Sequence, residues 1–279
     1  MADAHLRRLL EWALEEDIGP GDVTTLPLVP PHRKGRARII AKEPMILAGL
    51  DVVREVFLLL DAHLTILASS MEGESVDAGT VVFEAEGNLR ALLMGERTAL
   101  NFLQRLCGIA TRAAGYVKAV KGKKARIVDT RKTTPGWRSL EKHAVRVGGA
   151  QNHRMGLYDG VLIKDNHIQV CGGVREAVTR MKACACHLHK IEVEAADLQQ
   201  VREAVEAGAD VIMLDNMDMD QIKEAVEYIQ GRALVEVSGR VKKEALGRLA
   251  ECGVDLISIG ALTHSARSVD LSMDIRPID

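Results

Sequence analysis

EAGADVIML, residues 206–214, is the stretch that decides the fold this sequence predicts. Gly208 stands where an amphipathic helix would end, because glycine readily adopts the left-handed conformation that terminates helices. The apolar run that follows it is typical of a buried strand. A near-copy, ECGVDLISI, occupies residues 251–259. Two copies of one helix-to-strand junction indicate repeated strand–helix units.

Other short apolar or β-branched runs extend this pattern through the second half of the chain. We expect strands at residues 125–129, 160–163, 190–194, 211–214, 234–237 and 256–259. Spacings of roughly twenty residues between the later runs suit parallel strands joined by crossover helices. The pattern is typical of a β/α barrel, complete or incomplete, or of a doubly wound sheet.

The first part of the chain differs, because its expected strands have little helix between them. They lie at residues 36–43, 64–68 and 80–85, with one helix at 50–60. We therefore expect an α/β protein with a sandwich-like α+β domain over residues 1–111 and a β/α barrel catalytic domain over 112–268. A helical pattern at 91–120 joins them. The alternating tail, residues 269–279, should return to the first domain as an added strand.

Composition narrows the class of protein. Apolar residues make up 47% of the chain and charged residues 27%, which is ordinary for a globular protein. No apolar run is long enough to cross a bilayer, and the N-terminus lacks the apolar core of a signal peptide. The five cysteines show no framework spacing and are expected to be reduced thiols, so we expect a cytoplasmic protein. Aromatic residues, at 3%, are too few for a surface that stacks nucleic-acid bases.

Positive charge is concentrated in one segment of a chain whose net charge is −2. Residues 126–167 hold eight Lys or Arg against four Asp or Glu, a local net charge of +4. A slightly acidic protein that gathers positive charge in this way is expected to use it on an anion.

The residues that follow the expected strands are candidates for a binding site, because a barrel's active site lies at the carboxyl ends of its strands. Guanidinium groups at Arg131 and Arg154 can hold carboxylates or phosphates through paired hydrogen bonds, and Lys132 and Lys164 add compact positive charge. The ligand should therefore be multiply anionic.

Carboxylates and glycines follow the remaining strands. Glu194 and Asp215 are too few for a calcium cage, but two carboxylates plus substrate phosphates is the usual way to hold Mg²⁺. Ser238-Gly239 and Gly260-Ala261 offer backbone N–H groups near helix starts, which commonly bind phosphate.

Eight motifs spread over nearly the whole chain resemble those of quinolinate phosphoribosyltransferase, also called carboxylating nicotinate-nucleotide pyrophosphorylase. They are EDIGPGDVTT (16–25), GERTALN (95–101), DTRKTTPG (129–136), NHRMGL (152–157), IKDNH (163–167), EVE (192–194), LDN (214–216) and SIGALT (258–263). The resemblance implies that quinolinate and phosphoribosyl pyrophosphate react, with Mg²⁺, to nicotinate mononucleotide, pyrophosphate and CO₂ in NAD biosynthesis.

The resemblance also implies roles for individual residues. Thr130, Arg131, Lys132, His153 and Arg154 should line the quinolinate site. Lys164, Glu194 and Asp215 should face the ribose, the pyrophosphate and Mg²⁺, with Glu194 and Asp215 as the metal-binding pair. Ser238, Gly239, Gly260 and His264 should hold phosphate groups. Lys132, Lys164, Glu194 and Asp215 are the catalytic candidates, and Arg97 should reach the site from a neighbouring subunit, which implies a homodimer or a larger assembly.

The chain departs from the family at Arg240, where Ser-Gly-Gly is usual and Ser238-Gly239-Arg240 stands. Arginine adopts positive-φ conformations less readily than glycine, and its side chain could either block a phosphate or contact it. Two other functions remain open: a phosphoribosyltransferase for a pyridine monocarboxylate, and an anion-binding relative associated with molybdenum transport.

Three further patterns have two interpretations each. Cys184, Cys186, His187 and His189 could bind zinc, but without a CxxC pair we favour a loop. Lys164 could be a Schiff-base lysine, against which neighbouring Asp165 and the implied phosphates argue. Arg138, Lys142 and Arg146, at four-residue steps, are expected to form one solvated helix face rather than a second anion site.

Overall fold

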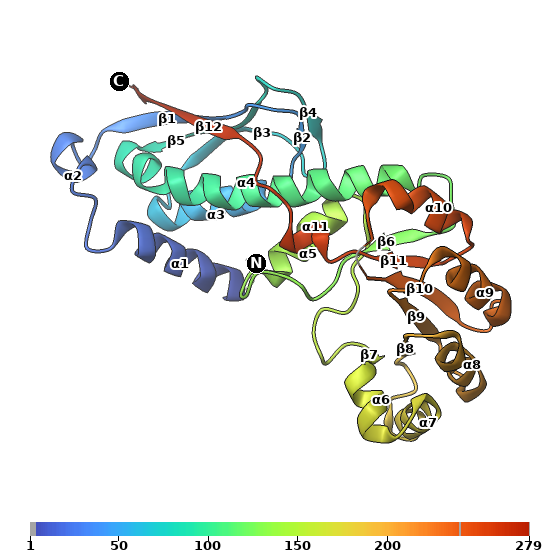
Figure 1. Ribbon diagram of the computed structural model, residues 1–279. Coiled ribbons are helices and arrows are strands. Elements are labelled where there is room, and N and C mark those ends of the chain that lie inside the picture. The colour runs from blue at the N-terminus through green and yellow to red at the C-terminus, as the bar shows by residue number, and fades with distance from the viewer. Residues whose placement is uncertain (1–3, 240, 279) are drawn as a thin grey trace. The chain divides into compact units, whose positions relative to one another are not determined.

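The computed structural model describes residues 4–239 and 241–278 and divides into two compact units (Figure 1). One, the antiparallel unit, comprises Met1–Arg112, Pro135–Gly148 and Ala266–Asp279. The other, the barrel unit, comprises Ala113–Thr134 and Gly149–Ser265. The helix α4 (Leu89–Ala119) runs from the first unit into the second.

The antiparallel unit is built on a four-stranded sheet with one face buried. Its strands, in spatial order, are β12 (Leu271–Ile278), β1 (Lys34–Ala41), β5 (Val81–Asn88) and β3 (Thr65–Ser69). Residues along β1 alternate between exposed and buried, and Ala37 and Ile39 belong to the core. The pairing of β12 with β1 places the end of the chain in this sheet, as expected for the tail.

Helices complete this unit. They are α1 (Ala4–Ile18), α2 (Thr25–Leu28), α3 (Leu50–Leu60), α5 (Arg138–Val147) and the first part of α4, beside a small pair of strands, β2 (Met45–Ile46) and β4 (Ser75–Val76). Figure 1 shows α3 and α4 along one face of the sheet. Phe57 of α3 stacks with Phe83 of β5, their ring centroids 6.3 Å apart, so the core lies between that sheet face and the helices.

The helix α5 corrects one expectation. Lys142 is 0% exposed, although Arg146 on the same helix is exposed, so a single solvated face is wrong. Trp137, just before α5, stacks on Phe102 of α4, and Arg105 bonds to buried Glu141 at 2.9 Å. Four-residue spacing shows which side chains share a side of a helix, but not what packs against that side. These contacts also place α5 in the antiparallel unit, whereas the expected domain division assigned it to the barrel.

A close approach of the chain explains one glycine inside α4. A Cβ atom at Gly108 would collide with the carbonyl oxygen of Arg267, in the segment that leads to β12. Only glycine leaves room for that backbone to pass. The interior glycine therefore does not break α4, which continues through all 31 of its residues.

The barrel unit contains six parallel strands in a barrel-like arrangement. In spatial order they are β6 (Arg126–Val128), β11 (Leu256–Ser258), β10 (Leu234–Ser238), β9 (Val211–Asp215), β8 (Ile191–Ala195) and β7 (Val161–Ile163). All six lie where the sequence predicts strands. Among the described residues no ladder joins β7 to β6, so the barrel is incomplete.

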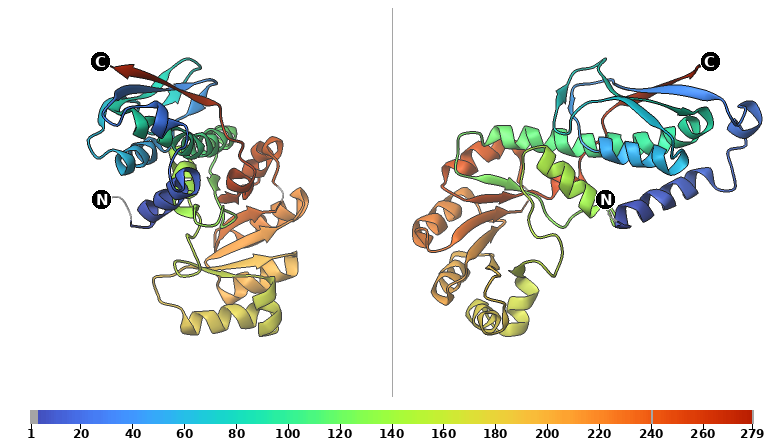
Figure 2. Two further views of the ribbon diagram at one scale, coloured as in Figure 1. Left: turned by 90° about the vertical axis from the view of Figure 1, so that its left-hand side faces the viewer. Right: turned by 180° about the vertical axis from the view of Figure 1, so that it is seen from behind.

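Helices follow these strands along the chain. They are α6 (Asp165–Cys171), α7 (Val174–Cys184), α8 (Leu198–Ala207), α9 (Met219–Ile229), the 3₁₀ turn η1 (Lys243–Ala245), α10 (Leu246–Glu251) and α11 (Ala261–His264). Figures 1 and 2 show α8 and α9 along one face of the sheet.

The repeated junction has a structural purpose. Gly208 and Gly253 adopt φ values of +72° and +86°, the left-handed region. The aspartate two residues after each of them accepts a hydrogen bond from the start of the neighbouring strand: Asp210 from Ile191 N–H at 2.8 Å and Asp255 from Val235 N–H at 3.0 Å. Each copy therefore ends one helix and aligns two adjacent strands.

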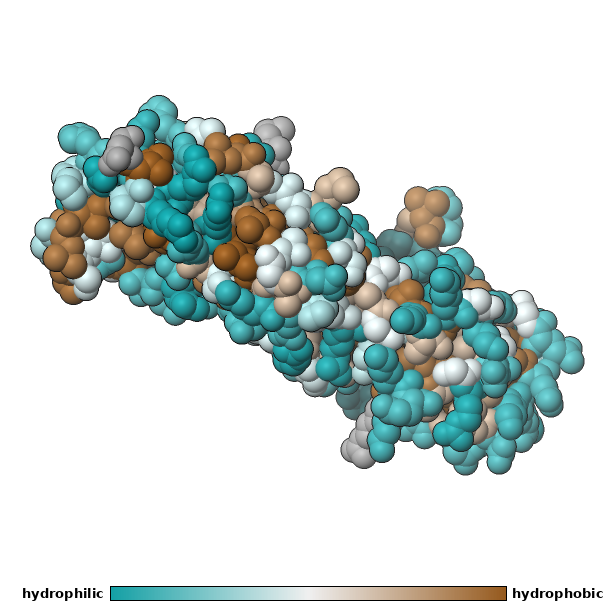
Figure 3. Space-filling model, turned by 90° about the horizontal axis from the view of Figure 1, so that it is seen from above, coloured by the Kyte–Doolittle hydropathy of each residue, from teal (hydrophilic) through white to brown (hydrophobic). Residues whose placement is uncertain are grey.

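The surface and the cysteines fit an ordinary globular chain. No described helix has both the length and the apolar character needed to cross a bilayer. On the face shown in Figure 3, hydrophilic residues interrupt the apolar ones. All five cysteines are free thiols, and burial raises the pKa of Cys107 to about 12.

Candidate active site

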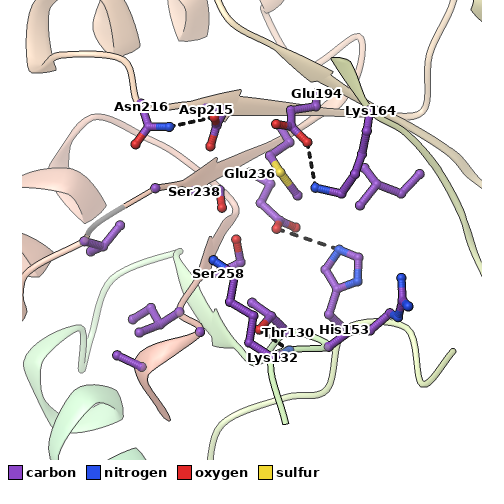
Figure 4. Close-up of a pocket in the computed structure, with 18 of the residues that line it drawn as sticks. Thr130, Lys132, His153, Lys164, Glu194, Asp215, Asn216, Glu236, Ser238 and Ser258 are labelled. Atoms are coloured by element: carbon purple, nitrogen blue, oxygen red, sulfur yellow. Dashed lines mark hydrogen bonds and ion pairs between the residues drawn. The ribbon is translucent and has the colours of Figure 1, made fainter. Parts of the chain in front are cut away.

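A cavity of about 580 Å³ opens at the carboxyl ends of the barrel strands (Figure 4). It gathers twelve of the thirteen residues that the sequence nominates: Thr130, Arg131, Lys132, His153, Arg154, Lys164, Glu194, Asp215, Ser238, Gly239, Gly260 and His264. The thirteenth, Arg97, is an exposed residue of α4 in the antiparallel unit and does not line this cavity. The residues that follow the predicted strands therefore meet in one cavity.

The loop after β6 is held by short polar contacts. The Thr130 hydroxyl accepts the backbone N–H of Lys132 at 3.0 Å, and the Thr263 hydroxyl donates to the Lys132 carbonyl at 2.6 Å. A Cβ atom on Gly260 would lie 2.8 Å from the Lys132 side chain. Glycine at this position therefore lets the lysine cross the end of β11 and enter the cavity.

Asp129, at the end of β6, positions the segment that carries His153 and Arg154. Its carboxylate, 0% exposed, accepts the His153 backbone N–H at 2.8 Å and the Asn152 side-chain amide at 2.6 Å. Asp129 therefore holds the loop that carries two site residues in position.

The electrostatics favour an anion beside Arg154. Burial, followed by the nearby charge of Arg131, lowers the pKa of Arg154. Its guanidinium donates to the Gly160 carbonyl at 3.1 Å, which holds the side chain in place. Two guanidinium groups that repel each other would both be stabilised by a carboxylate or phosphate between them.

The cavity also contains an ion pair and a second carboxylate. Lys164 Nζ and Glu194 Oε2 lie 2.9 Å apart. The Asp215 carboxylate accepts the Asn216 side-chain amide at 2.6 Å. Figure 4 shows these groups on neighbouring strand ends and pointing into the same space.

Gly239 adopts a backbone conformation that would be strained for any other residue. Its φ is +95°, and a Cβ atom there would lie 3.0 Å from the Asn216 backbone nitrogen. Asn216 itself has a positive φ of 54°. Arg240, whose departure from the family raises a question, lies outside the described residues.

Nearby, His264 ends the short helix α11, and its Nδ1 lies 2.7 Å from the Ser265 hydroxyl. Its side chain lines the cavity, as do Gly260, Ser238 and Gly239. The lining therefore combines small and polar groups with the guanidinium groups.

Sequence reasoning missed the acid at the floor of the cavity. Glu236, in β10, is 1% exposed and lies 3.8 Å from His153 Nε2. Glu192, in β8, lies 3.0 Å from the same nitrogen. Burial first, and the Glu192 charge second, raise the pKa of Glu236 to about 7. The available signal was a single acid between valines in an otherwise apolar strand, Val235-Glu236-Val237.

The cysteine–histidine stretch lies away from this cavity. Cys184 and Cys186 are exposed, free thiols. Within the described part of the chain, His153, Glu192 and Glu236 form the one group of three or more potential donors that come close together, and the stretch contributes none of them.

Comparisons with known proteins agree with this geometry. Models of the N-terminal and C-terminal domains of quinolinate phosphoribosyl transferase match residues 22–107 and 109–274. A probable carboxylating nicotinate-nucleotide pyrophosphorylase of Bacillus subtilis is 43% identical, over 99% of this chain and 95% of its own. A protein of the same name from Synechocystis is 46% identical, over 96% and 91%.

Solved structures show the same fold. NadC from Streptococcus pyogenes superposes with a TM-score of 0.96 at 41% identity, over 100% of this chain and 99% of its own. The nicotinate-nucleotide pyrophosphorylase from Francisella tularensis gives 0.93 at 40% identity, over 98% and 96%.

Proposed function

Because the chain belongs to the quinolinate phosphoribosyltransferase family, we propose that it transfers the phosphoribosyl group of phosphoribosyl pyrophosphate to quinolinate in NAD biosynthesis. The products are nicotinate mononucleotide, pyrophosphate and CO₂. The observation that carries this proposal is that the charges of Arg131 and Arg154 interact in a cavity that Lys164, Glu194 and Asp215 also line.

The guanidinium groups suit quinolinate, which is a dicarboxylate. Arg131 and Arg154 each present a planar fork of N–H donors that matches a carboxylate, and Lys132 adds a point charge. Thr130 and His153 line the same cavity. A pyridine monocarboxylate would supply only one carboxylate to the two guanidinium groups, which disfavours that alternative.

A second group of lining residues suits the phosphates of the second substrate. Lys164 faces the ribose and pyrophosphate, and Ser238, Gly239, Gly260 and His264 supply small or polar groups at which phosphate can approach the backbone. Gly239 is needed for its left-handed turn, and Gly260 for its contact with Lys132.

The donor set fits Mg²⁺. Glu194 and Asp215 offer carboxylate oxygens to one cavity, and this cation is usually bound by one or two carboxylates together with substrate phosphates. When bound, it would neutralise charge on the pyrophosphate. The present partners of these carboxylates, Lys164 and Asn216, keep them directed into the cavity.

The chemistry requires no nucleophilic side chain. Departure of pyrophosphate leaves positive charge on the ribose, and the pyridine nitrogen captures it when both substrates are held in line. Fixed cations then stabilise the negative charge that develops on the ring as the carboxylate beside nitrogen leaves. Lys132, Lys164, Glu194 and Asp215 therefore contribute positioning and electrostatics.

The five free thiols fit a reducing compartment such as the cytoplasm.

Arg97 extends the proposal to the assembly. It is exposed on α4, and we assign it to the site of a neighbouring subunit in a homodimer. Arg97→Ala should abolish turnover without changing the melting temperature. Mixing it with the separately inactive Lys164→Ala should restore part of the activity, because mixed dimers contain one intact composite site. Folded single variants that restore nothing on mixing would contradict a shared site.

Substrate choice tests the function. The purified protein, with phosphoribosyl pyrophosphate and Mg²⁺, should form nicotinate mononucleotide from quinolinate and not from nicotinate. Turnover of nicotinate alone would identify a monocarboxylate transferase. Anion binding without turnover of either compound would favour a binding protein.

A further inference from the structure

Glu236 lies between two cavities. It lines the catalytic cavity and also a second one, of about 340 Å³, at the amino ends of the strands. The second cavity is lined by residues that begin strands, among them Arg126, Val161, Val211 and Leu256. His153, Arg154 and Glu236 are common to both cavities. A group at this position can exchange a proton with solvent on one side and face a substrate on the other.

The hydrogen bonds of His153 determine what faces Glu236. Its Nδ1 accepts the Arg154 backbone N–H at 2.8 Å, so this nitrogen carries no proton. The remaining proton of a neutral imidazole is then on Nε2, which lies 3.0 Å from Glu192 Oε2. His153 therefore donates to Glu192 and has no further proton to give.

A proton is retained between the two buried acids. Glu192 and Glu236 interact directly, and two carboxylates that share a buried site do not both ionise readily. Glu236 is the more buried of the two. Burial, the charge of Glu192 and a hydrogen bond with Glu192 raise the pKa of Glu236 to about 7. The charge of His153 and a hydrogen bond with Ser258 lower it by less. Met213 of β9, beside it, is apolar.

Glu236 also differs from the other acids of the catalytic cavity. Glu194 is paired with Lys164 and Asp215 with Asn216. Glu236 Oε1, in contrast, is buried and has no hydrogen-bond partner in the described part of the chain. The cavity is also lined by four cationic side chains, which attract the substrate's carboxylates and are not neutral acids. They are Arg131, Lys132, Arg154 and Lys164.

We propose that Glu236 is the acid that protonates the ring carbon from which CO₂ departs, an assignment that rests on the function proposed above. The bond between that carbon and its carboxylate breaks, CO₂ leaves, and the electron pair stays on the ring carbon. The carbon takes the proton of the Glu236 carboxyl group, forming a C–H bond and a Glu236 carboxylate. The carboxylate then regains a proton from solvent through the second cavity.

The pH dependence of Glu236→Gln tests this assignment. Gln has the shape of the protonated acid and cannot transfer a proton. In the wild-type enzyme, kcat should fall as the pH rises through about 7, because Glu236 loses its proton. In Glu236→Gln, kcat should be about a hundredfold lower and this fall should be absent, while the KM for quinolinate changes little. Unchanged kcat, or a slower enzyme that keeps the wild-type fall, would overturn the proposal.

The first turnover separates proton transfer from phosphoribosyl transfer. With Glu236→Gln, pyrophosphate should be released at the wild-type rate, and nicotinate mononucleotide should follow slowly. Equal slowing of both products would show that Glu236 only supports the site, which would overturn the assignment.

Three variants serve as references. Glu236→Asp keeps an acid, so this variant should be slower than the wild type but should still lose kcat as the pH rises. A kcat of Glu236→Asp that does not fall with rising pH would count against the proposal. Glu192→Gln removes the neighbouring charge, so the fall should move to lower pH. Glu227→Gln, on the exposed side of α9, should match the wild type in both rate and pH profile. A wild-type protein with no activity on quinolinate would instead refute the proposed function itself.

Discussion

At the carboxyl ends of the barrel strands, Lys164 and Glu194 form an ion pair in which 47% of the lysine side chain is exposed. Two residues deeper along the same strand as Glu194, Glu192 is buried beside Glu236 and His153. The outer pair lies where solvent and ligands reach it. At the inner position, burial first and the Glu192 charge second raise the pKa of Glu236 to about 7. One strand thus provides Glu194 for binding and Glu192, which affects the proton of a neighbouring acid.

The largest effect should come from removing an outer cation. Arg154→Ala should reduce kcat/KM for quinolinate by an amount equivalent to about 2–5 kcal/mol, because a carboxylate would lose its paired hydrogen bonds. Steady-state kinetics with quinolinate as the varied substrate measures this loss. Arg146→Ala, which removes an exposed arginine of α5, is the matched control and should have no effect. A similar loss in both variants would contradict a specific role for Arg154.

The inner acids should affect stability with the opposite dependence on pH from an ordinary ion pair. The folded chain raises the pKa of Glu236 from 4.5 to about 7, so the stabilisation is complete below pH 4.5 and is lost as the pH rises through 7. Glu236→Gln does not lose it. The variant should therefore gain about 3 kcal/mol of unfolding free energy relative to the wild type between pH 4 and pH 8. Denaturant unfolding at several pH values measures this difference. A difference between variant and wild type that is the same at pH 4 and pH 8 would contradict a buried, protonated Glu236.

Glycine geometry among the proposed phosphate-binding residues should have an intermediate effect. Gly239→Ala should cost about 1–2 kcal/mol of stability through its positive φ. It should also raise the KM for phosphoribosyl pyrophosphate, because the new methyl group meets Asn216. Gly231→Ala separates the two effects, since Gly231 has a φ of +74° and open space around it. Gly231→Ala should lose stability without a change in KM. A raised KM in this variant would show that the contact with Asn216 does not explain the effect at Gly239.

The smallest effect should come from the repeated junction. Asp210→Ala should cost about 1 kcal/mol of unfolding free energy, because Ile191 loses a hydrogen bond that water can partly replace. Asp255→Ala should cost more, since its bond to Val235 is buried. Neither should change kcat. Equal costs for the two variants, measured by thermal unfolding, would show that burial does not distinguish the copies.

The sequence predicts the barrel strands well because each is a short apolar run bounded by a glycine or a polar residue. The strand-end rule then locates twelve site residues without coordinates. It fails for Glu236 because that acid lies inside a strand, where only the register of neighbouring strands reveals that Glu192 and His153 face it. It also fails for Lys142, because no local pattern shows that α5 is covered. The role proposed for Arg97 involves a second subunit, about which one chain gives no geometry.

The proposed reaction depends on two carboxylates, one that remains and one that leaves. Quinolinate labelled with ¹⁴C in the carboxylate beside the ring nitrogen tests this directly, with CO₂ and nicotinate mononucleotide measured together. One labelled CO₂ should appear for each nicotinate mononucleotide, and none without phosphoribosyl pyrophosphate. Nicotinate mononucleotide without labelled CO₂, or CO₂ release that does not need the second substrate, would contradict the proposed function.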